Sequence, residues 1–256
     1  MVKIAFFDID GTLVDMETKI ITNTMLEALK TLQKNGIKII IATGRPPVAI
    51  PNFDNIKFDA YMAFNGAYCF NDKEVIFSNP IDHEDVLQII ENGKQIGRPV
   101  LLSRLDCNGA NGSDPELEEF MAISKQSVDI KENFDEFAKE NVYQIMVGVF
   151  PHEREALLKD VKNAQLTTWW PKAGDIIPKN GGKGVAVEQI LQYFGFTKDE
   201  AIAFGDGTND VEMLEAVGVG VAMENATDDL KKVADVICPH VRKDGVVQYL
   251  KSAGLL

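Results

Sequence analysis

The chain has 256 residues and lacks the features that define several classes of protein. Its three cysteines lie far apart and outside any CxxC pattern, so neither a disulfide framework nor a zinc site is expected. No apolar stretch approaches the ~20 residues of a membrane helix, and the N-terminus reaches an aspartate too early for a secretory signal. We find no internal repeat or low-complexity tract. These absences predict a soluble, cytoplasmic protein.

Basic residues are also scarce. The chain has 26 Lys and Arg against 39 Asp and Glu, which gives a formal net charge of −13. Because nucleic acids and anionic membranes bind basic patches, neither is an expected partner. Small anionic ligands are still compatible with this charge if the site supplies its own local cations. No feature of the sequence indicates an obligate protein partner.

What is present is an alternation of strands and helices at both ends of the chain. Short apolar runs that end in polar turn residues predict buried strands, and apolar residues at i, i+3 spacing predict helices between them. The expected strands are "VKIAFF" (2–7), "IKIIIATG" (37–44), "AIAF" (201–204), "VGVGVAM" (217–223) and "DVIC" (235–238), and the expected helices are 22–34, 184–194, 210–216 and 228–234. The β-α-β order predicts a doubly wound parallel sheet of the α/β, Rossmann-like class.

The middle of the chain has a different pattern, with polar joints that contain Gly and Pro. Helices are expected at 84–96, 115–126 and 152–164, and strands at 99–103, 142–150 and 166–170. About 100 residues is the size of a small domain. We therefore expect residues 1–81 and 183–256 to form the sheet domain, and residues 82–182 to form an inserted α+β domain.

Polar side chains follow three of the expected core strands. Asp8 and Asp10 follow the first strand, Thr43 and Gly44 follow the second, and the segment "GDGTND" (205–210) follows "AIAF". Ligands of parallel α/β sheets bind beyond the carboxyl ends of the strands, so these residues are expected at one rim. Any one aspartate here could be a turn or cap residue. Coincidence across three strands favours a site.

Two familiar motifs, the EF-hand calcium loop and the P-loop, do not match these segments. "DIDGTLVDMETK" (8–19) has glycine at the fourth position of a calcium loop instead of the sixth, and it has no glutamate at the twelfth. "GGKG" (181–184) is not a P-loop, because glycine follows Lys183 and no glycine stands five positions before Gly182. Crowded carboxylates instead suggest a hard divalent cation, and oxygen ligands suit Mg²⁺ better than zinc. Magnesium held in this way typically engages phosphate, for which Thr43 and Lys183 can supply donors and positive charge.

Taken together, the motifs resemble those of the haloacid dehalogenase-like phosphatases, and within them the Cof-type group. "DIDGT" (8–12), "ATGR" (42–45), Lys183 in "GGKG" and "GDGTND" (205–210) match motifs one to four in order and spacing, and "FNGA" (64–67) is similar to the segment that leads towards the family's cap domain. Because the segment between Thr43 and Lys183 is long, the inserted domain falls after the second motif. In this position it resembles the α/β cap of the Cof-type group. One departure is Gly182, where many relatives carry asparagine.

The resemblance implies a role for each matching residue. Asp8 is the expected nucleophile, which forms an aspartyl-phosphate, and Asp10 is the expected general acid and base. Mg²⁺ is expected to be held by Asp8, Asp206 and the backbone carbonyl of Asp10. The remaining expected roles are phosphate binding (Thr43, Gly44, Lys183 and Asn209), support of the metal and its loop (Asn209 and Asp210), and contact with substrate or cap (Arg45 and Asn65). For Arg45 a structural ion pair is an equally good interpretation.

The expected function is a Mg²⁺-dependent phosphatase that hydrolyses small phosphorylated metabolites, with sugar phosphates as the substrate class that the resemblance implies. Two alternatives stay open. A phosphomutase would use the same aspartyl-phosphate but return the phosphoryl group to a sugar. A regulator that binds a phosphorylated ligand without turnover would need none of the reactive groups, although every reactive position holds a chemically competent residue.

Overall fold

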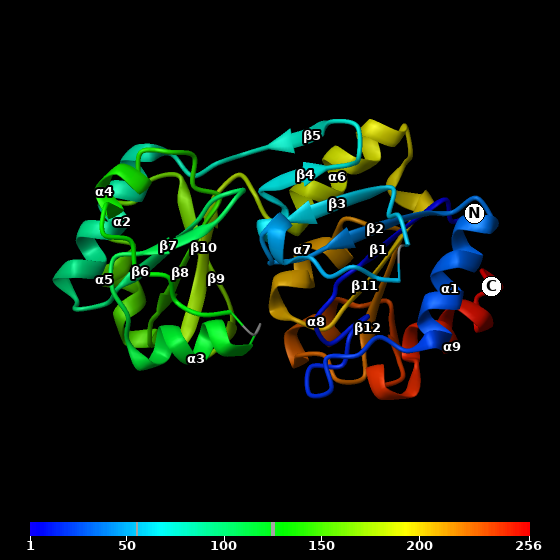
Figure 1. The fold of residues 1–256 in the computed structure, drawn as a ribbon. Helices are drawn as coiled ribbons and strands as arrows, with labels where there is room; N and C mark the ends of the chain where they lie inside the picture. The colour runs from blue at the N-terminus through cyan, green and yellow to red at the C-terminus, as the bar shows by residue number, and fades with distance from the viewer. Residues whose placement is uncertain (55, 124–125) are drawn as a thin grey trace. The chain divides into compact units, whose positions relative to one another are not determined.

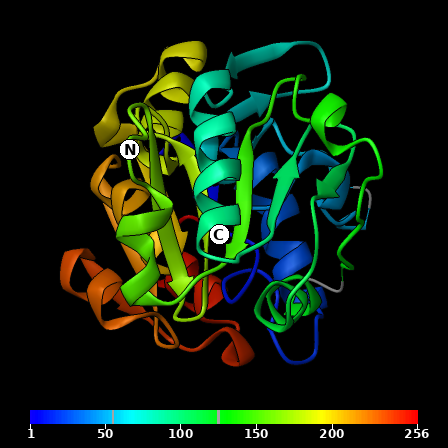
Figure 2. The same cartoon turned by 90° about the vertical axis from the view of Figure 1, so that its left-hand side faces the viewer.

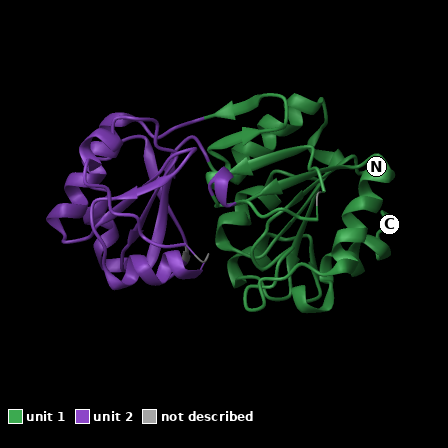
Figure 3. Ribbon diagram, in the orientation of Figure 1, with its two compact units in different colours: residues 1–45, 50–78, 182–256 green, residues 46–49, 79–181 purple. Residues whose placement is uncertain are grey.

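The computed structural model describes residues 1–54, 56–123 and 126–256. The chain forms two compact units (Figure 3). Unit 1 comprises residues 1–45, 50–78 and 182–256, and unit 2 comprises residues 46–49 and 79–181. Among the described residues, no helix is both long and apolar enough to cross a membrane.

Unit 1 is built on an eight-stranded sheet with the order β13-β12-β11-β1-β2-β3-β4-β5 (Figure 1). The six strands from β13 to β3 pair in parallel, whereas β4 and β5 extend the sheet as antiparallel strands. The strands are β1 (Ile4–Phe7), β2 (Lys38–Ala42), β3 (Ala60–Ala63), β4 (Tyr68–Phe70), β5 (Val75–Ser78), β11 (Ala201–Gly205), β12 (Val219–Met223) and β13 (Val236–Cys238). Every residue of β1 and β11 is buried, as expected of strands covered on both faces.

Helices lie on both faces of this sheet. Helices α1 (Asn23–Lys34) and α9 (Gly245–Ser252) contact each other on one side in Figure 1, and α6 (Lys183–Phe194), α7 (Val211–Glu215) and α8 (Asp228–Val233) form a second group on the other. Helix α1 begins where the Thr22 hydroxyl accepts a hydrogen bond from the Met25 amide. Its buried residues include Leu26, Leu29 and Leu32, so the apolar spacing places one face against the sheet.

Unit 2 is an antiparallel five-stranded sheet with the order β7-β6-β8-β10-β9. Its strands are β6 (Val100–Ser103), β7 (Asn108–Ala110), β8 (Gln144–Gly148), β9 (Ala164–Trp170) and β10 (Ala173–Pro178), and its helices are α2 (His83–Gln95), α3 (Pro115–Ile123), α4 (Phe134–Phe137) and α5 (Arg154–Leu157). Figure 2 shows α2 lying across one face of this sheet. There Val86 and Ile89 pack with Val100 and Ile145 in one apolar cluster.

Short 3₁₀ turns join several elements of both units. They are η1 (Pro47–Ala49), η2 (Phe64–Gly66), η3 (Pro151–Glu153), η4 (Lys198–Glu200), η5 (Thr208–Asp210) and η6 (Val241–Lys243). η2 directly follows β3, and η5 begins three residues after the end of β11, so both bring backbone turns to the rim where those strands end.

The structure corrects two expected helices in unit 2. The helix expected at 152–164 ends at Leu157, because Asp160 adopts a left-handed backbone (φ 61°) and the chain enters β9 at Ala164. The helix expected at 115–126 ends at Ile123, and residues 124 and 125 lie outside the described part of the chain. Helices α4 and α9 and strands β3, β4, β5, β7 and β10 were not anticipated.

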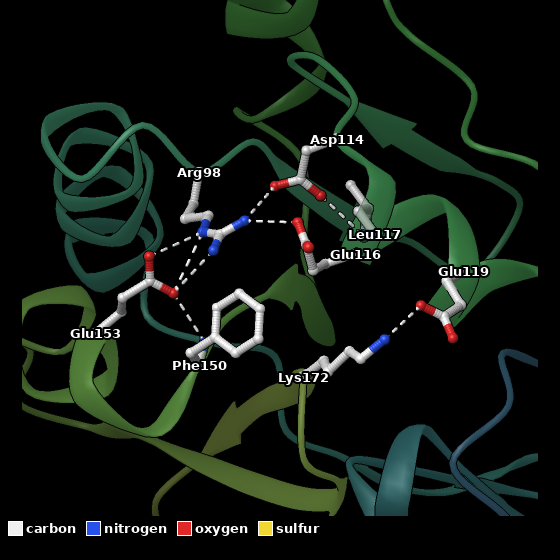
Figure 4. A network of polar contacts seen from close by, with 8 residues as sticks. All are labelled: Arg98, Asp114, Glu116, Leu117, Glu119, Phe150, Glu153 and Lys172. Carbon is white, nitrogen blue, oxygen red and sulfur yellow. Dashed lines mark hydrogen bonds and ion pairs between the residues drawn. The ribbon is translucent and has the colours of Figure 1, made fainter.

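Unit 2 also contains a network of charged side chains centred on Arg98 (Figure 4). The Arg98 Nη1 atom lies 3.1 Å from Asp114 Oδ2 and 2.8 Å from Glu116 Oε2, and its Nε atom lies 3.1 Å from Glu153 Oε1. The guanidinium also stands 5.1 Å from the centre of the Phe150 ring. Because only 13% of the Arg98 side chain is exposed, this single cation ties together the loop before α3, the start of α3 and the turn before α5.

Candidate active site

The rim of the unit 1 sheet brings together residues that are far apart in the sequence. In the parallel register, Phe7 of β1 lies between Ile41 of β2 and Phe204 of β11, so the residues that follow these strands emerge side by side. Asp8 follows β1 and Asp206 follows β11. Asp210 is the last residue of the turn η5 after β11. One carboxylate oxygen from each of these three aspartates lies within 4.8 Å of the other two, close enough to share a metal ion.

Lys183 places an ammonium group against two of these carboxylates. It is the first residue of α6, and its Nζ atom lies 2.7 Å from Asp8 Oδ1 and 2.5 Å from Asp210 Oδ1. Burial alone would lower the pKa of Lys183, but the negative charges of Asp210 and Asp8 raise it above its ordinary range. The lysine is therefore held in its charged form inside the protein, where it is 1% exposed.

Asp8 is only partly compensated by this lysine. Burial raises the pKa of its carboxyl from an ordinary 3.8 to about 7, against the opposing charge of Lys183 and with a further contribution from the charge of Asp210. A nucleophilic carboxylate must be ionised, so further positive charge is needed beside Asp8 for full ionisation at neutral pH.

Asp206 has even less compensation. Its carboxylate accepts two long hydrogen bonds, from Thr12 Oγ1 at 3.5 Å and from Asn225 Nδ2 at 3.3 Å. Among the described residues, no ion pair joins it to a basic side chain. Burial raises the pKa of Asp206 well above its ordinary value, and the neighbouring charges of Asp8 and Asp210 raise it further. The cluster thus has three carboxylates and one ammonium group, a composition that fits a hard divalent cation.

Asp210 differs from Asp206 because both of its oxygens accept short hydrogen bonds, whereas those to Asp206 are long. Oδ1 accepts from Lys183, and Oδ2 accepts from the backbone amides of Asp206 and Gly207, each at 3.0 Å. The side chain is fully buried. It therefore fixes the loop that carries Asp206.

The Asp10 side chain is not one of the three carboxylates that lie close enough to share a metal ion. Its carboxylate forms a two-pronged ion pair with Arg45, with Nε to Oδ2 at 2.7 Å and Nη2 to Oδ1 at 2.8 Å. The guanidinium of Arg45 thus covers both oxygens of the expected general acid. This two-pronged contact fixes the direction of the Asp10 side chain.

The turn after β3 supports the residues that follow β2. The Thr43 amide donates to Met62 O at 2.8 Å, so its hydroxyl, rather than its amide, is the group that can face a ligand. The backbone amide of Asn65 donates to Thr43 O at 3.0 Å. The side-chain Oδ1 of Asn65 accepts from Asn209 Nδ2 at 2.8 Å. A Cβ atom at Gly44 would lie 3.1 Å from the side-chain amide of Asn65. These contacts join the second and fourth motifs through Asn65.

This turn is also unusual in its backbone. Phe64 and Asn65 have positive φ values of 51° and 54°, and Gly66 follows at 92°. Non-glycine residues in this region cost about 1–3 kcal/mol each and persist where the surroundings impose them. The strain therefore lies beside the candidate site.

Glycines at two positions allow close approach. A Cβ atom on Gly11 would stand 2.0 Å from Asp206 Oδ2, so only glycine lets this carboxylate lie against the loop after β1. Gly182 precedes Lys183 with φ 103° and ψ 163°, a conformation that is essentially restricted to glycine. Glycine at position 182, in place of the asparagine of many relatives, therefore suits the backbone conformation of this loop.

Sequence reasoning did not assign roles to two residues that contact Asp206. Thr12 lies within the first motif, and Asn225 follows strand β12. The signal for Asn225 was available, because it comes two residues after a parallel strand, at the same rim as the other site residues. It was overlooked because no motif marked it.

Comparisons with known proteins agree with this site. Residues 5–250 match the family described as haloacid dehalogenase-like hydrolase. A Bacillus subtilis (strain 168) protein named "Putative phosphatase YkrA" is 30% identical over 257 residues, which cover 99% of this chain and 98% of that protein. A Haemophilus influenzae protein named "Putative phosphatase" is 33% identical over 265 residues, with 98% of each chain covered. A solved structure described as a HAD subclass IIB sugar phosphatase is 31% identical, with a TM-score of 0.91 over 100% of both chains.

The chain belongs to the haloacid dehalogenase-like hydrolase family. The resemblance seen in the motifs is therefore confirmed, as are the α/β fold class with its inserted domain and the expectation of an enzyme of the phosphatase group. For the cofactor, the structure supports the coarser statement that three aspartates lie close enough to hold a metal ion.

Proposed function

We propose that this protein is a Mg²⁺-dependent phosphatase that hydrolyses small phosphorylated metabolites, with sugar phosphates as its substrate class. The observation that carries the proposal is the cluster of Asp8, Asp206 and Asp210 around one buried lysine. The substrate class is suggested by the sugar phosphatase whose structure this chain resembles.

In this proposal Asp8 and Asp206 hold Mg²⁺ through their side chains and Asp10 through its backbone carbonyl, while Asp210 supports them. The fit rests on Asp206, a half-buried carboxylate that has no ion-pair partner among the described residues and is repelled by two neighbours. Bound Mg²⁺ supplies positive charge that keeps the carboxylates ionised and neutralises phosphate oxygens.

Asp8 then attacks phosphorus through a carboxylate oxygen. The new P–O bond forms as the bond to the ester oxygen breaks, and Asp10 gives its proton to the departing alkoxide. In the second step Asp10 takes a proton from water, whose oxygen attacks phosphorus and releases Asp8. Arg45 covers both Asp10 oxygens in the structure, which fits the ionised form of Asp10, so this ion pair is open while Asp10 carries its proton and re-forms once the proton has passed to the alkoxide.

The remaining polar residues act through position and charge. Lys183 keeps Asp8 close to its ionised state and adds positive charge at the phosphate site. The Thr43 hydroxyl, the Gly44 amide and Asn209 orient phosphate oxygens, and Asn65 holds Asn209 in place. Removing one such donor commonly lowers turnover by ~10²- to 10³-fold.

The two units divide the work in this proposal. Unit 1 carries the chemistry, because all the residues named above belong to it. Unit 2 selects the substrate and corresponds to the inserted domain expected at 82–182. Arg45 ends one segment of unit 1, directly before the short segment 46–49 that groups with unit 2.

The test is phosphate release from a panel of sugar phosphates with Mg²⁺ or with EDTA. We expect release with Mg²⁺ and none with EDTA. Asp8→Asn should abolish release while retaining cooperative unfolding, and Asp229→Asn, an exposed aspartate paired with Lys232, serves as the matched control. Sugar phosphate isomers formed without free phosphate would indicate a mutase. Binding without any turnover would indicate a regulator, and full turnover by Asp8→Asn would exclude Asp8 as the nucleophile.

A further inference from the structure

Asn225 links the loops that follow four neighbouring strands of the unit 1 sheet. It comes after β12, and its Nδ2 atom donates to Gly11 O at 2.8 Å, in the loop after β1, and to Asp206 Oδ2 at 3.3 Å, in the loop after β11. Its Oδ1 atom accepts from the Val241 amide at 3.1 Å, in the segment after β13. These four strands are adjacent in the sheet order β13-β12-β11-β1.

The chemistry of these three contacts requires an amide. Gly11 O and Asp206 Oδ2 are acceptors, whereas the Val241 amide is a donor. A primary amide supplies two N–H donors on one side and an acceptor on the other, so Asn225 satisfies all three. A carboxylate at this position could accept from Val241 but would set oxygen against oxygen at the other two contacts.

Asn225 acts on a carboxylate whose freedom is already limited. Gly11 packs against Asp206 so closely that a Cβ atom there would be 2.0 Å from Oδ2. The same oxygen receives the Asn225 hydrogen bond, while Oδ1 accepts the long 3.5 Å hydrogen bond from Thr12 Oγ1. The loop after β1 and the Asn225 amide therefore both constrain the Oδ2 side of the Asp206 carboxylate.

We propose that Asn225 is a positioning residue, which fixes the Asp206 carboxylate in the orientation that binds the divalent cation. This inference rests on the proposed function, since it presumes that Asp206 holds Mg²⁺. Hydrogen bonds to metal-ligating carboxylates orient them, and their loss typically weakens metal binding by about 10- to 100-fold. Because the Asn225 contact is long and Gly11 supplies a second constraint, the lower end of this range is expected.

The competing explanation is that Asn225 only ties loops together. Its bonds to Gly11 O and Val241 N would then contribute to stability, and its loss would lower the unfolding temperature without changing the affinity of the folded protein for Mg²⁺. Metal affinity, measured well below the unfolding transition, separates the two roles.

The experiment is calorimetric titration of the metal-free full-length protein with Mg²⁺ in the absence of substrate. We expect Asn225→Ala to weaken Mg²⁺ binding by about tenfold. Asn71→Ala is the matched control in the same unit, because the Asn71 side chain also makes three hydrogen bonds, to Tyr193 Oη and to the amides of Lys73 and Glu74. That variant should bind Mg²⁺ like the wild type. If Asn225→Ala does not fold, Asn225→Gln, with its amide one methylene further out, is titrated instead with the same expectation.

The outcomes separate the inference from the proposed function. Wild-type protein that binds no Mg²⁺ would remove the proposed function itself. Wild-type binding with unchanged affinity in the Asn225 variant would overturn the positioning role alone, whatever the change in unfolding temperature. An equal loss of affinity in Asn71→Ala would also overturn it, because the effect would then not depend on contact with Asp206. Weaker binding in the Asn225 variant alone supports it.

Discussion

Replacing Lys183 by methionine removes the only ammonium group that contacts the acid cluster in the described part of the chain, while keeping a side chain of similar length. In the wild type its Nζ atom lies 2.7 Å from Asp8 and 2.5 Å from Asp210, and all three side chains are nearly inaccessible to solvent. Breaking a buried ion pair by removing one partner typically costs about 3–5 kcal/mol, because the other charge stays buried and unpaired. We expect a loss of this size in the free energy of unfolding of the metal-free protein at about pH 8.

The loss should depend on pH in a defined direction. The pKa of Asp8 is about 7 in the folded wild type and near 3.8 when unfolded, so the folded state binds the extra proton and the metal-free protein loses stability as pH rises from about 4 to about 7. Without Lys183 the folded pKa rises further and this window extends to higher pH. At about pH 5 Asp8 can take up a proton, so the difference between variant and wild type should shrink there.

The assay is urea unfolding of wild type and Lys183→Met at both pH values, with EDTA and with millimolar Mg²⁺. Added Mg²⁺ should restore part of the lost stability at the higher pH, because it replaces the missing positive charge. Lys232→Met is the control, since Lys232 contacts Asp229 on the exposed surface and should give no measurable change. A loss below ~1 kcal/mol at high pH, or an equal loss at both pH values, would refute this electrostatic account of the cluster.

Two further predictions concern stability away from the acid cluster. Arg98→Met should lower the free energy of unfolding by about 1–3 kcal/mol, less than for a fully buried pair because water reaches the three carboxylates around it. Urea unfolding of Arg98→Met is compared with that of the control Arg104→Met. Arg104 has an ion pair of 3.4 Å with an exposed aspartate. An equal loss of stability in the two variants would contradict the prediction. Gly182→Asn should cost about 1–3 kcal/mol, because its φ of 103° and ψ of 163° disfavour any side chain. The control for thermal unfolding is Gly36→Asn. Gly36 follows a helix end with φ 79°, and no atom lies within 4 Å of the new Cβ. A similar small loss of stability at both positions would show that the backbone at Gly182 adjusts to the side chain.

The parts of the fold that follow from local patterns were predictable. Helix α1 has a capping threonine, a regular apolar face and a glycine after its end, and all three signals agree with its bounds. The buried strands β1, β2 and β11 are short apolar runs that stop at polar residues. Because parallel strands deliver their carboxyl ends to one rim, this pattern also predicted that Asp8 and Asp206 would meet.

The parts that depend on distant partners were not predictable in the same way. The apolar residues after Arg154 have helical spacing, but the chain leaves the helix, passes the left-handed residue Asp160 and enters β9, which pairs with β10. The ion pair between Arg45 and Asp10 joins residues 35 positions apart, and no periodicity encodes it. Asn225 needs partners on three other loops, so its importance is visible only once the sheet order is known.

The position of β1 between β2 and β11 has a consequence for synthesis of the protein on the ribosome. Asp8 is made early, but Lys183 lies 175 residues further along the chain, and Asp206 and β11 come later still. Residues 79–181 form the greater part of unit 2 as one continuous stretch, whereas unit 1 needs segments from both sides of that stretch. Since domains generally fold as units while the chain emerges, unit 2 can form before Lys183 reaches Asp8. A nascent polypeptide released before residue 183 therefore carries Asp8 without the lysine that contacts it in the folded protein.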